Sequence, residues 1–271
     1  MAHSLVDIGA NLTHGSFDED RDEVIGRAAS AGVTRIIVTG TDVQSSRDAL
    51  ALANTMPGTL YATAGIHPHH ASDFSPAVRE TLSVLTSEHA IVAVGECGLD
   101  YFRNFSPPEA QRDAFEAQLD LAAECGLPVF LHQRDAHEEF VDILTPKLGS
   151  ISAGVAHCFT GNRKALNDCL SMGLYIGITG WVCDERRGET LREVVSEIPL
   201  DRLMVETDSP YLLPRTLNPR PRSRRNEPVH LTEVLRVVAE AMGQPEEVIA
   251  RATTENAERF FGLENPSHAD N

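Results

Sequence analysis

Short apolar runs alternate with longer amphipathic stretches along almost the whole chain. Eight of these runs have the length and composition of buried strands, and the stretches between them place apolar residues at helical spacing. This alternation predicts βα units arranged around a parallel sheet. The predicted strands are Leu5–Ile8, Arg35–Val38, Leu60–Ala64, Ile91–Val94, Val129–Leu131, Gly154–Ala156, Leu174–Ile176 and Leu203–Val205, and clear helical patterns cover Asp18–Ala31, Glu109–Cys125 and Arg163–Met172.

The number of predicted strands favours a closed barrel over an open doubly wound sheet. A (β/α)8 TIM barrel typically takes about 250 residues, which suits a chain of 271 residues. No GxGxxG motif opens a helix, so the main dinucleotide-binding alternative is removed. No repeat, linker or low-complexity run divides the sequence. We therefore expect an α/β fold in which residues 1–271 form a single TIM-barrel domain.

Ionisable residues follow four of the predicted strands. Glu96 follows IVAVG, His132 follows PVFL, His157 follows GVA, and Asp208 lies at the end of LMVET. The carboxyl ends of barrel strands converge on the face that holds active sites, so these side chains should meet in space. One histidine after a strand is commonly an ordinary polar residue, but four clustered ionisable groups need a compensating charge. Two imidazoles and two carboxylates suit one or two divalent cations.

Further polar residues belong to the same face of the predicted barrel. His67, in GIHPHH, follows the third strand and could bind a metal, contact phosphate or protonate a leaving group; a purely structural role is the alternative. Its neighbours His69 and His70 are expected to face solvent. Glu206 and Asp100 are expected to hydrogen-bond the metal ligands, or in the case of Glu206 to bind water associated with the ion, a weaker assignment than the first four.

The charge of the chain is −17, which argues against a passive nucleic-acid-coating protein. Residues 212–228 nevertheless combine four prolines with five arginines, which predicts a long ordered loop after the last strand. Arg224 and Arg225 of this loop are candidates for binding the phosphate backbone; balancing an acidic surface is the alternative. Tyr101, with Phe102 and Phe105, could stack on a terminal base, or the phenylalanines could pack the loop onto the barrel.

Seven segments occur in an order that resembles the TatD family of metal-dependent deoxyribonucleases. They span almost the entire chain and read GIHPH, GECGLDYFRN, PVFLHQRDAHE, HCFTG, GITGW, ETDSPYLLP and RRNEP. The resemblance implies an amidohydrolase-like (β/α)8 barrel with magnesium-dependent nuclease activity. It assigns metal binding to Glu96, His132, His157 and Asp208, and it places His67 in the site.

The sequence departs from the family at one point. Many members begin with Asp-x-His-x-His, whereas the matching stretch here is Asp7-Ile-Gly-Ala-Asn11, so Gly9 and Asn11 replace the two histidines. Glycine has no side-chain ligand, and asparagine is a weak donor. The remaining carboxylates favour Mg²⁺, with Mn²⁺ also suitable and Zn²⁺ less so.

The resemblance implies 3′-to-5′ exonuclease action on single-stranded DNA, with RNA as a further substrate and a role in DNA repair or turnover. Catalytic roles fall to Asp208, Glu96 and His67, although Asp208 can be either the base or a ligand. Two other functions stay open: a metal-dependent carboxyl-ester or amide hydrolase, for example an aminoacyl-tRNA deacylase, and a non-catalytic barrel that only binds.

The remaining expectations concern the surroundings of the protein. Five cysteines without a CxxC pair indicate reduced thiols in a cytoplasmic protein. No apolar run is long enough to span a membrane, so no membrane partner is expected. A monomer is the default oligomeric state.

Overall fold

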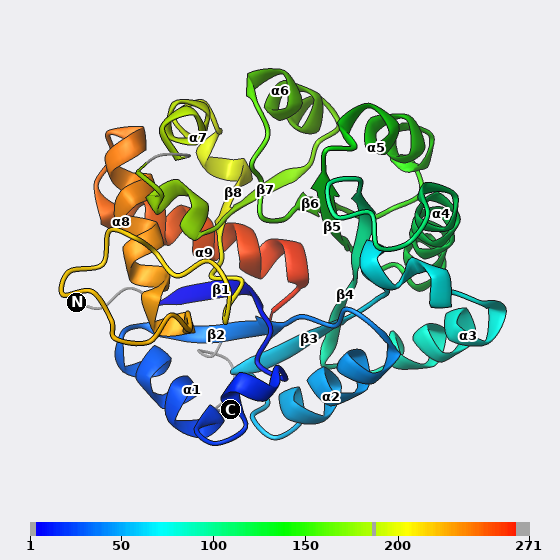
Figure 1. The fold of residues 1–271 in the computed structure, drawn as a ribbon, viewed down its shortest axis with the longest axis horizontal. Coiled ribbons are helices and arrows are strands. Elements are labelled where there is room, and N and C mark those ends of the chain that lie inside the picture. Colours follow the sequence, from blue (N-terminus) through cyan, green and yellow to red (C-terminus); the bar gives the residue numbers. More distant parts are fainter. Residues whose placement is uncertain (1–3, 186–187, 264–271) are drawn as a thin grey trace, which may run out of the picture.

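The computed structural model describes residues 4–185 and 188–263. Within them, parallel strands pair in sequence order and form a barrel with helices around its outside (Figure 1). The strands are β1 (Leu5–Ala10), β2 (Val33–Val38), β3 (Leu60–Ala64), β4 (Ile91–Asp100), β5 (Val129–Arg134), β6 (Gly154–Ala156), β7 (Tyr175–Ile178) and β8 (Leu203–Val205).

The first seven helices of the described ranges connect successive strands on the outer face of the barrel, and the last two follow β8. They are α1 (Arg21–Ser30), α2 (Val43–Ala53), α3 (Pro76–Leu85), α4 (Pro108–Cys125), α5 (His137–Leu144), α6 (Arg163–Ser171), α7 (Gly188–Val195), α8 (Leu231–Met242) and α9 (Glu246–Phe261), with short 3-10 turns at Gly15–Phe17, Pro68–Asp73, Thr145–Lys147, Gly180–Cys183, Leu200–Arg202 and Pro228–His230. No helix in these ranges is long and apolar enough to cross a membrane.

The TIM-barrel prediction is confirmed, and each predicted strand coincides with an observed one. The main difference lies in β4 and β5, which continue past their apolar runs to Asp100 and Arg134. Their backbones stay paired through the polar residues, with Gly98 opposite His132 and Asp100 opposite Arg134. The apolar pattern ends early because the site itself occupies the last residues of these strands.

The core has two layers. One lies between the strands and the surrounding helices, and the other fills the barrel interior with residues such as Ile8, Phe130 and Met204. Helix α9 crosses the amino end of the barrel and adds Phe260 and Phe261 to the inner layer (Figure 1). Polar side chains of α9 also bind the beginnings of the strands at this end.

Three of these polar contacts fix α9 against the beginnings of the strands. Thr254 donates to the Ser4 carbonyl oxygen, and Asn256 donates to that of Leu203. Buried Arg35 of β2 pairs with Glu258. With the amino end closed in this way, the carboxyl end is left as the face that can admit a substrate.

Removing the Phe260 ring should destabilise the barrel without reaching its functional face. Phe260 is buried and packs edge-on against Tyr175 and Phe261. We expect Phe260→Ala to lower the free energy of unfolding by about 3–5 kcal/mol, measured by urea denaturation. A loss below about 1 kcal/mol would show that α9 does not close the barrel as described.

Candidate metal centre

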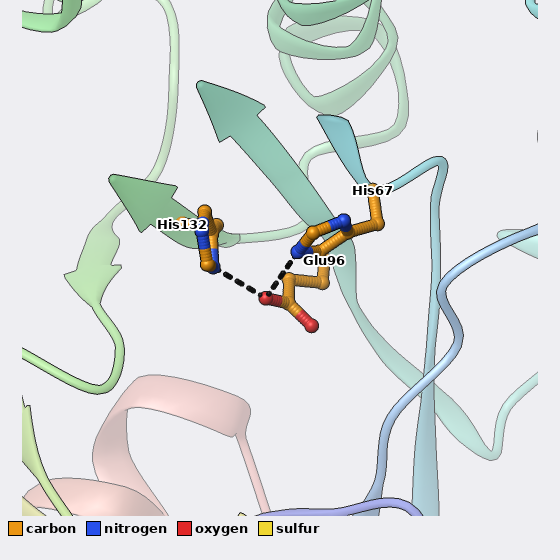
Figure 2. A group of neighbouring side chains, drawn as sticks. All are labelled: His67, Glu96 and His132. Atoms are coloured by element: carbon orange, nitrogen blue, oxygen red, sulfur yellow. Dashed lines mark hydrogen bonds and ion pairs between the residues drawn. The ribbon is translucent and has the colours of Figure 1, made fainter. Parts of the chain in front are cut away.

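The centre of the site is the Glu96 carboxylate in β4. Its Oε1 lies 2.8 Å from His132 Nδ1, 2.8 Å from His157 Nε2 and 3.3 Å from His67 Nε2. Figure 2 shows two of these imidazoles, from β5 and from the segment after β3, directed at the same carboxylate. Glu96, His67 and His157 are buried, and His132 is half-buried.

Two glycines of β4 make this convergence possible. Gly95 and Gly98 both have φ of +141°, a region that favours glycine. A Cβ at Gly95 would lie 2.3 Å from the Phe130 carbonyl oxygen, and one at Gly98 would lie 2.0 Å from that of His132. The pairing of β4 with β5 shifts in register between Val94 and Cys97. The close approach of the two strands thereby sets Glu96 beside His132.

Carboxylates also face the outer nitrogens of two of these imidazoles. Glu206 Oε2 lies 3.2 Å from His157 Nδ1, and Asp100 Oδ2 lies 3.5 Å from His132 Nε2. Glu206 is hydrogen-bonded to the outer nitrogen of His157, which is the usual arrangement around metal-bound histidines. His132 Nε2 has no hydrogen-bond partner among the described residues. His132 and His157 present Nδ1 and Nε2 towards Glu96 as ligand atoms.

The pKa values in this cluster reflect burial opposed by opposite charge. Burial favours the neutral forms, but the facing imidazoles hold the pKa of Glu96 well below its usual value. Burial likewise opposes charge on His157, yet Glu96 and Glu206 raise its pKa well above the usual one. The raised pKa of His157 means that a proton lies between this ring and Glu96, and two imidazoles with a carboxylate form a donor set in which a divalent cation would take the place of such protons.

His67 differs from the other two histidines in its hydrogen bonding. Its Nδ1 accepts the backbone N–H of His69 at 3.0 Å, at the start of the Pro68–Asp73 turn. Burial lowers the pKa of His67 to about 4, so the ring is neutral at pH 7. A neutral ring whose Nδ1 accepts must carry its proton on Nε2. His67, Glu96 and His132 lie close enough to share an ion, but this tautomer makes His67 a hydrogen-bond donor instead.

Asp208 stands beside the cluster without touching it. It follows β8 in the left-handed region, with φ of +52°, and its Oδ1 accepts the Asn11 amide at 3.0 Å. Burial raises the pKa of Asp208 to about 7; the charge of His157 opposes the rise, and those of Glu96 and Glu206 add to it. The structure therefore brings Glu96, His67, His132 and His157 into direct contact and leaves Asp208 as a nearby half-buried carboxylate.

The neighbours of Gly9 and Asn11 explain why these two residues stand where many family members have histidines. A Cβ at Gly9 would lie 2.7 Å from Glu206 Oε2, and one at Gly177 would lie 2.7 Å from Glu206 Oε1. Glu206 is fully buried and fills the space that a side chain at position 9 would need. Asn11 binds Asp208. The departure at Gly9 and Asn11 is therefore coupled to the placement of these two carboxylates.

His69 was wrongly expected to face solvent. Its Nε2 lies 2.9 Å from Asp100 Oδ2, and its ring lies 4.2 Å from that of His67. Only His70 of the pair is exposed. The sequence analysis missed this contact because Asp100 is 31 residues away in the sequence, and only the extension of β4 to Asp100 brings it next to His69.

The candidate nucleic-acid contacts separate into two groups. Arg224 is exposed, whereas both terminal nitrogens of Arg225 are engaged by Asp20, Glu227 and the Ser16 carbonyl oxygen. Tyr101 donates to Glu139 at 2.5 Å, and burial raises its pKa to about 12. Arg225 and Tyr101 thus hold loops together in this structure.

The fold and the site define the class of protein: a TIM-barrel hydrolase with a buried imidazole and carboxylate centre at the carboxyl end of its strands. The family model described as TatD related DNase matches residues 6–262, and the chain belongs to this family. A protein of Pectobacterium carotovorum named 3′-5′ ssDNA/RNA exonuclease TatD is 53% identical over 96% of this chain and all of the relative, and one of the same name from Erwinia tasmaniensis is 54% identical over the same shares.

Solved structures agree with the family assignment. A TatD homologue from Escherichia coli K12 superimposes with a TM-score of 0.89 at 30% identity, covering 97% of this chain and 100% of the homologue. A TatD family hydrolase from Entamoeba histolytica gives 0.88 at 26% identity, covering 97% of this chain and 100% of that protein.

Asp7, at the edge of the site, should make stability depend on pH. It is fully buried, and burial raises its pKa from 3.8 to about 8, although hydrogen bonds from Thr207 and Gly9 oppose the rise. Folded protein then binds more protons than unfolded protein between about pH 4 and 8, so the contribution of Asp7 to stability falls as pH rises through this window.

The isosteric variant Asp7→Asn should remove that dependence. We expect its stability, relative to wild type, to increase from pH 5 to pH 8 by up to about 1.4 kcal/mol per pH unit, measured by urea unfolding at several pH values. Asp113→Asn, an exposed change on α4, is the control and should follow wild type. Parallel curves for Asp7→Asn and wild type would mean that Asp7 is ionised in the folded protein.

Proposed function

We propose that this protein is a Mg²⁺-dependent exonuclease that hydrolyses single-stranded DNA or RNA from the 3′ end. The observation that carries the proposal is the convergence of three imidazole nitrogens on one buried Glu96 oxygen at the open end of the barrel. Membership in a family of DNases and the names of the relatives support the reaction and the substrate. DNA repair or turnover, a cytoplasmic location and a monomeric state stay predictions.

Glu96, His132 and His157 would hold the cation, with Glu206 hydrogen-bonded to His157 and Asp100 3.5 Å from His132. The cation would supply positive charge to a non-bridging phosphate oxygen and to the attacking water. Two imidazoles and one carboxylate form a set that also suits Zn²⁺, so the preference for Mg²⁺ or Mn²⁺ rests on the family resemblance.

Asp208 is suited to accept a proton from that water. Its raised pKa of about 7 matches the range in which a general base works well near neutral pH. As water adds to phosphorus, its proton passes to Asp208, and the bond from phosphorus to the 3′ oxygen of the preceding nucleotide breaks, its electron pair leaving with that oxygen, which takes a proton from solvent water. The products are a 5′ mononucleotide and a shortened strand with a free 3′ hydroxyl.

His67 would bind a phosphoryl oxygen through its Nε2–H. A neutral ring with Nδ1 held by the His69 N–H keeps one donor directed into the site. Charge builds up on the phosphoryl oxygens during the reaction, so a fixed donor there stabilises the transition state. This role agrees with phosphate contact and not with protonation of the leaving group, for which the pKa of about 4 is too low.

Two alternatives remain distinguishable by experiment. An ester or amide hydrolase would use the same cation to polarise a carbonyl, and release of carboxylate from a generic ester would then exceed release of mononucleotides. A binding module would retain oligonucleotides without shortening them in Mg²⁺, Mn²⁺ or Zn²⁺.

Loss of Glu96 should abolish hydrolysis. We expect Glu96→Ala to lower the rate of shortening of a 5′-labelled single-stranded oligonucleotide by more than about 100-fold, since even residues behind metal ligands cost 10–100-fold. EDTA should stop the wild-type reaction and Mg²⁺ restore it, and a 3′ phosphate should block it. The control is Glu116→Ala on the exposed face of α4; a ladder that survives Glu96→Ala would place the site elsewhere.

The two loop arginines should respond differently to substitution. Arg224→Ala should raise KM for the oligonucleotide by about two- to fivefold with the melting temperature unchanged, because Arg224 is exposed and available to phosphate. Arg225→Ala should lower the melting temperature, because Asp20 and Glu227 lose one of the two arginines that they share, the other being Arg27. Steady-state kinetics and thermal melting of both variants check this; equal KM and equal melting for the two would contradict it.

A further inference from the structure

Exposed aromatic rings border the carboxyl end of the barrel. Among the described residues, the exposed large hydrophobic side chains are Val84, Phe102, Phe105 and Tyr211. Val84 lies on α3, but the three rings belong to loops that follow β4 and β8, where the site lies. Exposing a ring to water costs free energy, so three at the mouth of one site point to a shared function.

Phe105 stands next to the catalytic cluster on the β3–β4 side. Its ring centroid lies 4.7 Å from that of His69, which lies 4.2 Å from that of His67. Phe105 is nevertheless 68% exposed. One part of the ring is thus fixed against an imidazole that reaches the site, and the rest is open to a ligand.

Tyr211 occupies the corresponding place on the β8–β1 side. Its backbone N–H donates to the Asp208 carbonyl oxygen at 3.0 Å, and its ring meets that of His14 edge-on at 5.8 Å. Tyr211 is 52% exposed, so the rest of its ring is open to a ligand.

The loop that carries Phe105 is held rigidly despite its exposed rings. The fully buried Gln111 side chain donates to the Ser106 carbonyl oxygen at 2.8 Å and accepts the Asp100 N–H at 2.8 Å. Ser106 Oγ donates to the His69 carbonyl oxygen at 3.0 Å. A ring fixed before binding loses little entropy when a ligand stacks on it.

Phe102 extends this surface away from the site. The Arg134 guanidinium lies 4.0 Å from its ring centroid, and Arg103 lies at 5.7 Å. The β3–β4 side therefore offers two rings and two cations, whereas the β8–β1 side offers Tyr211. This asymmetry suits a strand of which one nucleotide lies on the Tyr211 side and the rest leaves over Phe105 and Phe102.

We propose that Tyr211 stacks on the 3′-terminal base and Phe105 on the penultimate base, so that the rings bracket the scissile phosphodiester at Glu96. This inference rests on the proposed exonuclease function. A chain with a net charge of −17 gains little from general attraction to phosphate. Every base has a face on which a ring can stack. Stacking the last two bases on separate rings requires them to be unpaired and separated from each other, so this arrangement would favour single strands.

The test combines ring variants with abasic substrates. On a single-stranded oligonucleotide, Phe105→Ala and Tyr211→Ala should each raise KM for the first cleavage by about tenfold and change kcat by less than about threefold. Phe105→Tyr and Tyr211→Phe keep a ring and should stay near wild type. Val84→Ala, an exposed change on α3, is the matched control.

Abasic substrates then assign each ring to a base. Without the penultimate base, Phe105→Ala should no longer differ from wild type, while Tyr211→Ala still should. Without the terminal base, the pattern should reverse. Ring effects that persist equally on both abasic substrates, or an unchanged KM in folded Ala variants, would overturn the bracket. A wild-type protein that never shortens the intact oligonucleotide would refute the exonuclease proposal instead.

Discussion

The structure of the site depends on an alternation of buried charges. Reading from side chain to side chain, Glu206 faces His157, His157 faces Glu96, Glu96 faces His132, and His132 faces Asp100, which in turn binds His69. A buried carboxylate is costly unless it is paired, and here each one meets at least one imidazole. Removing one of these side chains would leave the charge of its neighbours uncompensated, so the whole row of side chains acts as one unit.

Backbone geometry makes room for that chain of charges. Gly9 and Gly177 leave space for Glu206, while Gly95 and Gly98 let β4 approach β5. These four positions carry no ligand, yet each excludes a side chain on steric grounds. The glycine at position 9 is therefore explained by the space that Glu206 occupies. The site lacks a histidine ligand at this position and has instead a carboxylate that orients His157.

The fold and the main cluster could be predicted because both depend on local pattern. Apolar runs set the strands, and parallel strands in a barrel must bring their carboxyl ends together, so Glu96, His132 and His157 were placed in one site from sequence alone. The partners of His69, Arg225 and Tyr101 could not be predicted in this way. They are distant in sequence, namely Asp100, Asp20 and Glu139, and no periodicity encodes such pairs.

The contrast between His67 and the two other histidines separates holding a cation from acting on the substrate. His157 has the Glu206 carboxylate at its outer nitrogen, His132 has Asp100 3.5 Å from its outer nitrogen, and both rings direct the other nitrogen at Glu96. His67 has a backbone N–H at its Nδ1, so Nδ1 accepts and the proton of the neutral ring lies on Nε2, towards the site. Three imidazoles around one oxygen thus have different roles, cation binding or hydrogen-bond donation, which depend on what faces the outer nitrogen of each ring. Residue type and spacing alone do not contain this distinction, because it is made by the turn that begins at Pro68.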